Sequence, residues 1–317
     1  MCMKISRKMI MSLLCLVIIS CTSQQTAFTA MPLPTVATPQ LTTEHISGWV
    51  VYSVLVSREP FVTQIFLKNL YTGEVTQLTN SGNNGWPRWS PNGSQIIFDS
   101  QTEGNGIDIY LMNKDGSNQR PIVTSSANDL VPDWSPDGTK IAFVLSKDGN
   151  SNIFILDLQT MITTRLTNDS LGGFAPKWSP NGQKISFISN SSKNKRDGRS
   201  QVFIMNADGT NIEQLTPYNT DHFEDSPVWC PDSSCIIFMR FISGVPKLMF
   251  LDLANKETAT FLTGVFGENV TETNLTRSFS RGFITFVAGE MFYAMDIKTK
   301  KIYSLDVDNA LALSLYP

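Results

Sequence analysis

Short runs of alternating hydrophobic residues recur along this chain of 317 residues. Each run is an Ile-x-Phe triplet or a close variant, which is the period-two pattern of a strand that buries one face. Six runs begin at Val50, Ile96, Ile141, Ile185, Ile236 and Ile284. A second apolar run follows each one and ends on Asp or Asn, and a short third run usually closes on Leu-Thr. Turns such as Asp115-Gly116 suit tight hairpins, so the pattern predicts repeated antiparallel strands.

A longer motif precedes four of these runs. It reads Pro-x-Trp-Ser-Pro-Asn/Asp-Gly in three copies and Pro-Val-Trp-Cys-Pro-Asp-Ser in the fourth. Its tryptophans are Trp89, Trp134, Trp178 and Trp229, which are 45, 44 and 51 residues apart. Such a period is typical of repeats that each form one small β-sheet. With the Pro-x-Trp segment as first strand, each repeat is a four-stranded antiparallel meander, whose strands we call a, b, c and d in chain order.

Six such sheets arranged radially bury both faces of each sheet and leave only short edges. The sequence therefore predicts an all-β fold, a six-bladed β-propeller over residues 46–317. The first repeat begins directly with strand b at Gly48 and has no Pro-x-Trp segment of its own. Residues 310–317 follow the last strand d, where another strand a is due. We expect this C-terminal strand to complete the first blade and close the ring.

The Trp-Ser-Pro-Asp/Asn-Gly motif before Ile-x-Phe, together with the 205–210 segment before Leu215-Thr216, resembles the propeller repeats of the TolB family. The resemblance covers residues 48–317. TolB is a periplasmic protein of the Tol-Pal envelope system and carries a separate N-terminal α/β domain, for which residues 1–47 are too short. Similar repeats occur in the propellers of prolyl-oligopeptidase-type peptidases and in exported proteins without known activity. The resemblance thus implies a TolB-like propeller and leaves its role open.

The N-terminus has the pattern of a bacterial lipoprotein signal. A basic segment with Lys4, Arg7 and Lys8 precedes an apolar stretch, and small Ser20 stands just before Cys21. The apolar stretch is too short to span a bilayer, which needs about 20 residues. We predict a signal peptide over residues 1–20, a lipid attached to Cys21, and a flexible Thr/Pro-rich tether over residues 21–45. The alternative is an uncleaved membrane anchor.

Composition agrees with an exported domain. The net charge is −3 and charged residues make up 17% of the chain, so there is no basic field to attract nucleic acid. Apart from the cysteines of the N-terminal signal and the lipidation candidate Cys21, the cysteines are Cys230 and Cys235, which flank a predicted hairpin turn. A turn of this length can bring two Cα atoms to about 5.5 Å, so we predict a disulfide. The alternative is two free buried thiols.

The sequence contains none of the common catalytic motifs. There is no Gly-x-Ser-x-Gly elbow, His-Glu-x-x-His, phosphate-binding Gly-rich loop, or Cys/His cluster at metal spacing. We assign no catalytic residue and no cofactor, and metal binding stays undecided.

One candidate binding site lies in the loops that connect strand d of one repeat to strand a of the next. In the meander, these d-a loops share a face with the b-c loops, at the mouth of the central channel. Convergent carboxylates and a histidine there could bind a cation or the basic end of a peptide. The alternative is that they cap strands or stay solvated. The candidates are Asn84, Asp129, Asp221, His222, Glu224 and Asp225.

The predicted function is a membrane-tethered, extracytoplasmic binding or scaffold module for a protein or peptide. The expected location is the periplasmic or extracellular face of the bacterial envelope. The alternative is an enzyme, a hydrolase or lyase acting on an extracellular polymer at the channel mouth.

Overall fold

A computed structural model describes residues 40–42, 44, 46–102, 106–190, 199–261, 279–280, 282–288, 291–296, 298–307 and 310–316. The predicted signal peptide, Cys21 and most of the predicted tether lie outside these residues. None of the described segments is a helix long and apolar enough to cross a membrane.

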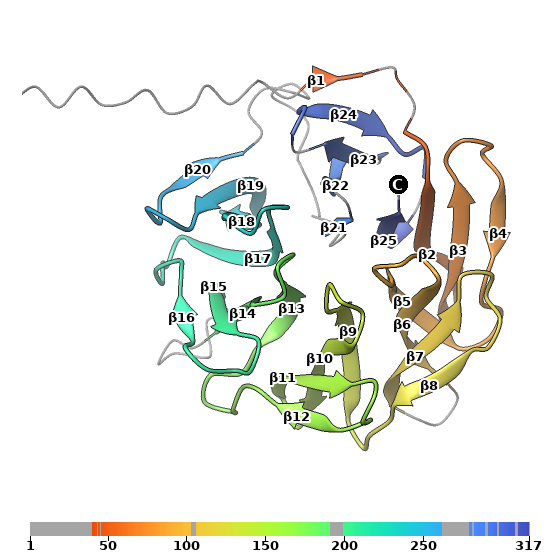
Figure 1. The fold of residues 1–317 in the computed structure, drawn as a ribbon, viewed down its shortest axis with the longest axis horizontal. Helices are drawn as coiled ribbons and strands as arrows, with labels where there is room; N and C mark the ends of the chain where they lie inside the picture. The colour runs from red at the N-terminus through yellow and green to blue at the C-terminus, as the bar shows by residue number, and fades with distance from the viewer. Residues whose placement is uncertain are drawn as a thin grey trace, which may run out of the picture. The chain divides into compact units, whose positions relative to one another are not determined.

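The described residues from Gln40 onward form six β-sheets arranged in a ring, which confirms the six-bladed propeller (Figure 1). From the inside outward, blade 1 contains β25 (Ala310–Tyr316), β2 (Trp49–Arg58), β3 (Phe61–Asn69) and β4 (Val75–Gln77). Blade 2 contains β5 (Asn83–Trp89), β6 (Gln95–Gln101), β7 (Ile107–Asn113) and β8 (Arg120–Val123). Blade 3 contains β9 (Asn128–Trp134), β10 (Lys140–Lys147), β11 (Asn150–Asp157) and β12 (Thr163–Arg165).

The second half of the ring repeats this order. Blade 4 contains β13 (Phe174–Trp178), β14 (Lys184–Ser189), β15 (Gln201–Asn206) and β16 (Glu213–Gln214). Blade 5 contains β17 (His222–Trp229), β18 (Cys235–Ile242), β19 (Val245–Asp252) and β20 (Thr258–Thr260). Blade 6 contains β21 (Phe279–Ser280), β22 (Phe283–Ala288), β23 (Met291–Asp296), β24 (Lys301–Ser304) and, as a fifth strand, β1 (Gln40–Leu41).

The ring is closed where blades 6 and 1 meet. The C-terminal strand β25 pairs antiparallel with β2, as predicted, so the last segment of the chain completes the first blade. Conversely, the N-terminal strand β1 joins the last blade, where it pairs parallel with β24. Beside it, Glu44 forms an ion pair with Lys301 at 2.7 Å. The end of the predicted tether therefore contributes a short strand to blade 6.

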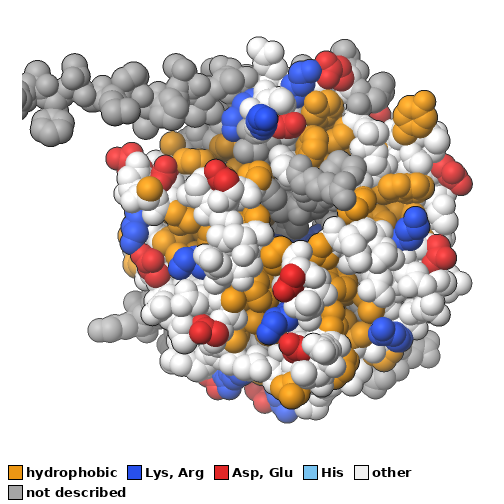
Figure 2. All heavy atoms as spheres, viewed as in Figure 1, with side chains coloured by type: hydrophobic (Ala, Val, Ile, Leu, Met, Phe, Trp, Pro, Cys, Tyr) orange, Lys and Arg blue, Asp and Glu red, His pale blue; other side chains and the backbone are white. Residues whose placement is uncertain are grey.

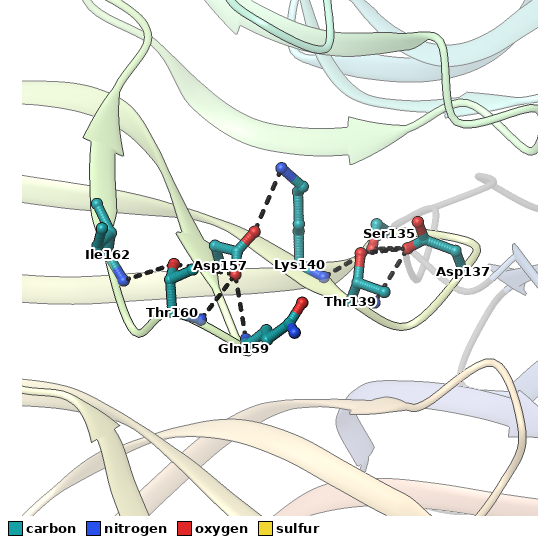
Figure 3. Close-up of polar contacts among 8 residues, drawn as sticks. All are labelled: Ser135, Asp137, Thr139, Lys140, Asp157, Gln159, Thr160 and Ile162. Carbon is teal, nitrogen blue, oxygen red and sulfur yellow. Dashed lines mark hydrogen bonds and ion pairs between the residues drawn. The ribbon is translucent and has the colours of Figure 1, made fainter.

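The Trp-Ser-Pro-Asp-Gly motif forms its a-b turn because its polar side chains bond the backbone of the turn (Figure 3). In blade 3, Ser135 Oγ donates to Asp137 Oδ1 at 2.6 Å and accepts from the Lys140 N–H at 2.9 Å. Asp137 Oδ1 also accepts from the Thr139 N–H at 3.0 Å, and the hydrogen bonds from Ser135 and Thr139 together lower the pKa of this carboxyl. Gly138 has a φ of 73°, which glycine adopts at little cost. The motif thus fixes where strand a stops and strand b starts.

Each strand a in blades 2 to 5 contains a β-bulge in which one residue has positive φ. The register with strand b shifts at this point. The residues with positive φ lie three positions before the repeat tryptophan and are Trp86, Val131, Ala175 and Ser226. Because none of them is glycine, the sequence carries no obvious signal for this bulge.

The hydrophobic core is divided among the junctions between blades. Six clusters of buried residues are present among the described residues, one for each pair of neighbouring blades. The aromatic residue of each Ile-x-Phe triplet in blades 2 to 6 is less than 2% exposed: Phe98, Phe143, Phe187, Phe238 and Phe286. The Leu-Thr pair supports strand c, since the hydroxyls of Thr79, Thr167 and Thr216 accept from strand-c N–H groups at 2.8 to 2.9 Å.

Candidate functional site

The repeat tryptophans link each blade to the one before it. Their exposed fractions are 8% for Trp89, 8% for Trp134, 9% for Trp178 and 2% for Trp229. Three indole N–H groups donate to a backbone carbonyl of the preceding blade, at Ser314, Arg88 and Lys177, with distances of 3.1, 3.3 and 3.0 Å. The indole N–H of Trp178 has no hydrogen-bond partner among the described residues. The indoles are therefore mainly structural, and their edges also face the centre of the ring.

A cavity of about 310 Å³ lies at the centre of the ring, on the face where the a-b turns meet. We call it the central recess. The four repeat tryptophans line it, together with Tyr316 and Gly282. The prolines of the four a-b turns also contribute: Pro91, Pro136, Pro180 and Pro231. Hydrophobic side chains on the viewed face lie in bands between neighbouring blades and around the centre of the ring, with charged groups between them (Figure 2).

The residue just before each tryptophan differs from blade to blade and also lines the recess. In blades 2 to 5 these residues are Arg88, Asp133, Lys177 and Val228. Lys177 Nζ pairs with Asp133 Oδ1 at 2.6 Å, with side-chain exposures of 6% and 15%. Asp133 Oδ2 accepts the Trp178 backbone N–H at 3.0 Å, and Arg88 Nη1 donates to Leu313 O at 3.0 Å. These charges join neighbouring blades and give the recess a polar floor beneath apolar walls.

The disulfide between Cys230 and Cys235 lies in the a-b turn of blade 5, beside the recess. The two Cα atoms are 5.2 Å apart, and both residues are buried. This bond closes a turn that has Pro231-Asp232-Ser233 in place of the Pro-Asn/Asp-Gly of the other copies.

The buried residues among those predicted from the d-a loops lie in different blade junctions. Asn84 is 2% exposed, and its Nδ2 donates to Gln64 Oε1 at 3.1 Å and to Ser81 O at 2.8 Å. Asp129 is fully buried at the start of β9, in the junction of blades 2 and 3. These two residues therefore face neighbouring blades, in different junctions.

The predicted candidates of blade 5 lie close together in sequence, and two of them are in contact. His222 Nε2 is 3.3 Å from Glu224 Oε1, and Arg240 Nε donates to the same oxygen at 3.0 Å. Burial raises the pKa of Glu224 against the opposing charge of Arg240. Burial, with Arg240 nearby, lowers the pKa of His222. Asp221 is exposed, and Asp225 Oδ1 accepts from the Ser226 N–H at 2.6 Å.

No group of three or more His, Cys, Asp or Glu side chains with metal-binding geometry occurs in the part of the chain that the structure describes. The central recess was not among the sites predicted from the sequence. A signal for it was nevertheless present, because strand a is innermost and its turn to strand b must lie near the axis. A Ser-Pro pair marks that turn in three copies, and Cys230-Pro231 marks it in the fourth.

Comparisons with known proteins agree with this architecture. A family model for the TolB beta propeller domain matches residues 50–144 and 130–273. TolB from Acinetobacter baumannii has a similar structure, with a TM-score of 0.67 and 19% identity over 86% of this chain and 68% of that chain. A puromycin-hydrolyzing peptidase from Mycobacterium tuberculosis matches with a TM-score of 0.58 and 13% identity, over 83% of this chain and 44% of that chain.

An oligogalacturonate lyase from Vibrio parahaemolyticus is also similar, with a TM-score of 0.53 and 14% identity over 76% of this chain and 70% of that chain. No curated protein matches the sequence. At these identities the structural likeness shows the fold, and the neighbours include both a Tol-system protein and enzymes.

The fold and the repeats together define a six-bladed β-propeller in which four blades carry the Pro-x-Trp repeat motif. Since the family model covers more than half of the sequence, the chain belongs to the TolB β-propeller domain family.

Proposed function

We propose that this chain is an exported, membrane-tethered propeller that binds a protein or peptide in its central recess. The observation that carries this proposal is the recess itself, whose walls are the indoles and prolines of the repeated a-b turns. Recognition sites are typically concave and mostly apolar, with a few fixed polar groups. A volume of about 310 Å³ suits one or two side chains of a larger partner.

The recess is built to bind at low entropic cost. Pro91, Pro136 and Pro231 are exposed on its rim and have fixed φ angles. The indoles behind them are held by hydrogen bonds to the neighbouring blade. A rigid, preformed surface loses little conformational freedom when a ligand binds.

The tether supports an envelope location. If Cys21 carries the diacylglycerol and acyl chains of a lipoprotein, it has the two hydrophobic anchors that stable membrane attachment requires. The N-terminal segment then holds the propeller at the membrane surface, where envelope proteins and their peptides are accessible. The family relationship to TolB agrees with a protein partner in this compartment.

The proposal can be tested with a phage-displayed library of linear peptides selected on the full chain in detergent. A triple variant with Pro91, Pro136 and Pro231 replaced by Glu adds three carboxylates to the rim and should lose binding of the selected peptides. A matched control replaces Val56, Phe61 and Val245 by Glu, because these exposed residues lie on b-c hairpins of the opposite face. Equal binding by both variants would reject the recess as the binding site.

The alternative function, an enzyme that acts on an extracellular polymer, can be tested by a direct activity assay. The full chain is incubated with polygalacturonate and with neutral polysaccharides, and new reducing ends are measured. Turnover that the rim variant abolishes would favour the enzyme over the binding module.

A further inference from the structure

One buried position at the junctions between blades is polar in three blades and differs in charge from one to the next. It lies five residues before the repeat tryptophan, near the start of strand a, and is occupied by Asn84, Asp129 and Glu224. Their exposed fractions are 2%, 0% and 1%. In blade 4 the position is Gly173, where a Cβ atom would approach Ile153 Cδ1 to 2.8 Å. Because the position is buried, each polar occupant needs a partner.

The junction of blades 1 and 2 shows how a neutral pair is satisfied. Asn84 Nδ2 donates to Gln64 Oε1 and to the Ser81 carbonyl. Gln64 Oε1 also accepts from the Thr79 hydroxyl at 2.6 Å, and Gln64 Nε2 donates to the Gly82 carbonyl at 2.9 Å. The amide N–H groups therefore satisfy Gln64 Oε1 and the carbonyls of Ser81 and Gly82.

The junction of blades 4 and 5 holds a charge with its counter-charge. Glu224 Oε1 accepts from Arg240 Nε at 3.0 Å, and His222 stands 3.3 Å away. A buried carboxylate is stabilised here by a guanidinium in the same blade.

The junction of blades 2 and 3 has acids in both places. Asp129 occupies the Asn84 position, and Asp108 occupies the Gln64 position on strand c. Asp108 is 9% exposed, and neither carboxylate oxygen of Asp129 has a hydrogen-bond partner of normal geometry among the described residues. Burial raises the pKa of Asp129 to about 6, the charge of Asp108 adds to this rise, and the nearby Ser125 hydroxyl opposes it. Burial also raises the pKa of Asp108, and a hydrogen bond from the Ser125 backbone opposes this rise.

Within the part of the chain that the structure describes, no cation offsets these two acids. No Lys or Arg among the described residues pairs with either acid. Lys147, at the end of β10, donates instead to Ser126 Oγ at 3.1 Å in an exposed contact. The carboxylate oxygens of Asp108 and Asp129 therefore occupy the positions of the amide groups at the junction of blades 1 and 2. A bound cation would offset their negative charge.

We propose that the junction of blades 2 and 3 binds a calcium ion, with Asp108 and Asp129 as its carboxylate ligands. A donor set of oxygens alone favours a hard cation. Calcium suits the place better than magnesium, because it accepts irregular shells of carboxylates, carbonyls and water, whereas magnesium demands a near-ideal octahedron. The ion bridges strand c of blade 2 and strand a of blade 3, so it acts on the rigidity of the ring. The site is separate from the central recess and does not depend on the proposed function.

The proposal is tested on the full chain in detergent, at constant pH 7.5, by isothermal titration with CaCl₂ and by thermal melting in Ca²⁺ or EDTA. We expect Asp108 and Asp129 to bind one calcium ion per chain. Binding should be half-saturated at a free Ca²⁺ concentration of about 0.1 to 1 mM, as in extracellular calcium modules. Calcium should raise the melting temperature, and the same concentration of MgCl₂ should raise it less.

The key variant is the double substitution Asp108→Gln with Asp129→Asn, which recreates the amide pair of blades 1 and 2. It should fold without calcium and lose the calcium-dependent rise in melting temperature. Asp129→Asn alone should weaken the affinity at least about tenfold. The matched control Asp221→Asn, an exposed acid in a d-a loop, should respond to calcium like the wild type.

Three results would overturn the proposal. The wild-type chain could fail to bind calcium at 10 mM. The double variant could keep the calcium response of the wild type. Stability could depend on pH through the two acids with no response to calcium, in which case a shared proton occupies the junction.

Discussion

The hydrogen bonds of the repeat tryptophans provide the sharpest test of how the blades are held together. In Trp229→Phe the indole N–H that donates to Lys177 O at 3.0 Å is lost, and a buried carbonyl loses this donor. In Trp178→Phe the substitution removes an indole N–H that is buried without a partner. Both substitutions replace a buried indole by a smaller phenyl ring, so the loss of packing energy is similar in the two variants. This loss largely cancels when the stability of one variant is subtracted from that of the other.

The magnitude follows from the two hydrogen-bond terms. A net hydrogen bond contributes about 1 kcal/mol, and a buried donor left unsatisfied costs about 1 to 3 kcal/mol. Trp229→Phe should therefore reduce the free energy of unfolding by at least about 1 kcal/mol more than Trp178→Phe. The difference reaches about 2 to 4 kcal/mol if the unpartnered N–H of Trp178 carries its full desolvation cost.

Urea unfolding followed by circular dichroism measures this difference, with the slope m checked for each variant so that the midpoints can be compared. Trp134→Phe is the internal control, since its longer bond of 3.3 Å to Arg88 O should place it between the other two. An equal loss of stability in Trp178→Phe and Trp229→Phe would refute the reasoning, because the packing term alone would then account for both.

Four further predictions concern closure, charge and anchoring. Deletion of residues 310–317 should abolish cooperative melting, because blade 1 loses its inner strand and the fully buried Leu313 and Leu315; a truncated chain that melts like the wild type would reject this closure. Burial raises the pKa of Asp129 in the folded state to about 6, against a reference value of 3.8. The folded state therefore binds this proton more tightly than the unfolded state does. In EDTA, the free energy of unfolding should fall by about 3 kcal/mol as the pH rises from about 4 to 6. Asp129→Asn should remove this slope in urea titrations at several pH values. Lys177→Met should cost up to about 3 to 5 kcal/mol because it leaves the largely buried carboxylate of Asp133 without its cation, and the double variant Lys177→Met with Asp133→Asn should recover part of the loss. Cys21→Ser should release the propeller from the membrane fraction while its melting temperature stays unchanged, and a Cys21→Ser protein that is processed normally and still sediments with membranes would point to a protein partner as the anchor.

The repeats predicted the propeller because each copy contains the same strand and turn motifs. The Ile-x-Phe triplet has the strand period, and Ser135 with Asp137 builds a turn whose bonds are all local. The closure by residues 310–316 was also predictable, since the first repeat lacked its strand a and one unassigned strand followed the last repeat. Features that arise from local chemistry and from counting strands can be read from a single sequence.

Features that depend on neighbouring blades could not be read in this way. The bulge places Val131 at a φ of 53°, a conformation that its branched side chain disfavours and that only the surrounding sheet can impose. A polar residue near a predicted loop, such as Asn84 or Glu224, looks the same in sequence whether it faces solvent or the next blade. The pairing of β1 with β24 likewise depends on an edge that is formed only in the folded ring.

Differences between the copies therefore carry the information about function. The turn residues, the Leu-Thr pairs and three of the four repeat tryptophans make equivalent contacts in successive blades, so they form the scaffold. The residue before each tryptophan changes from Arg88 to Asp133 to Lys177 and sets the charge of the recess floor. The residue five positions before it sets the charge of each junction. Because the backbone geometry is shared, one copy is a natural control for another, and the neutral pair of blades 1 and 2 shows what the acid pair of blades 2 and 3 lacks.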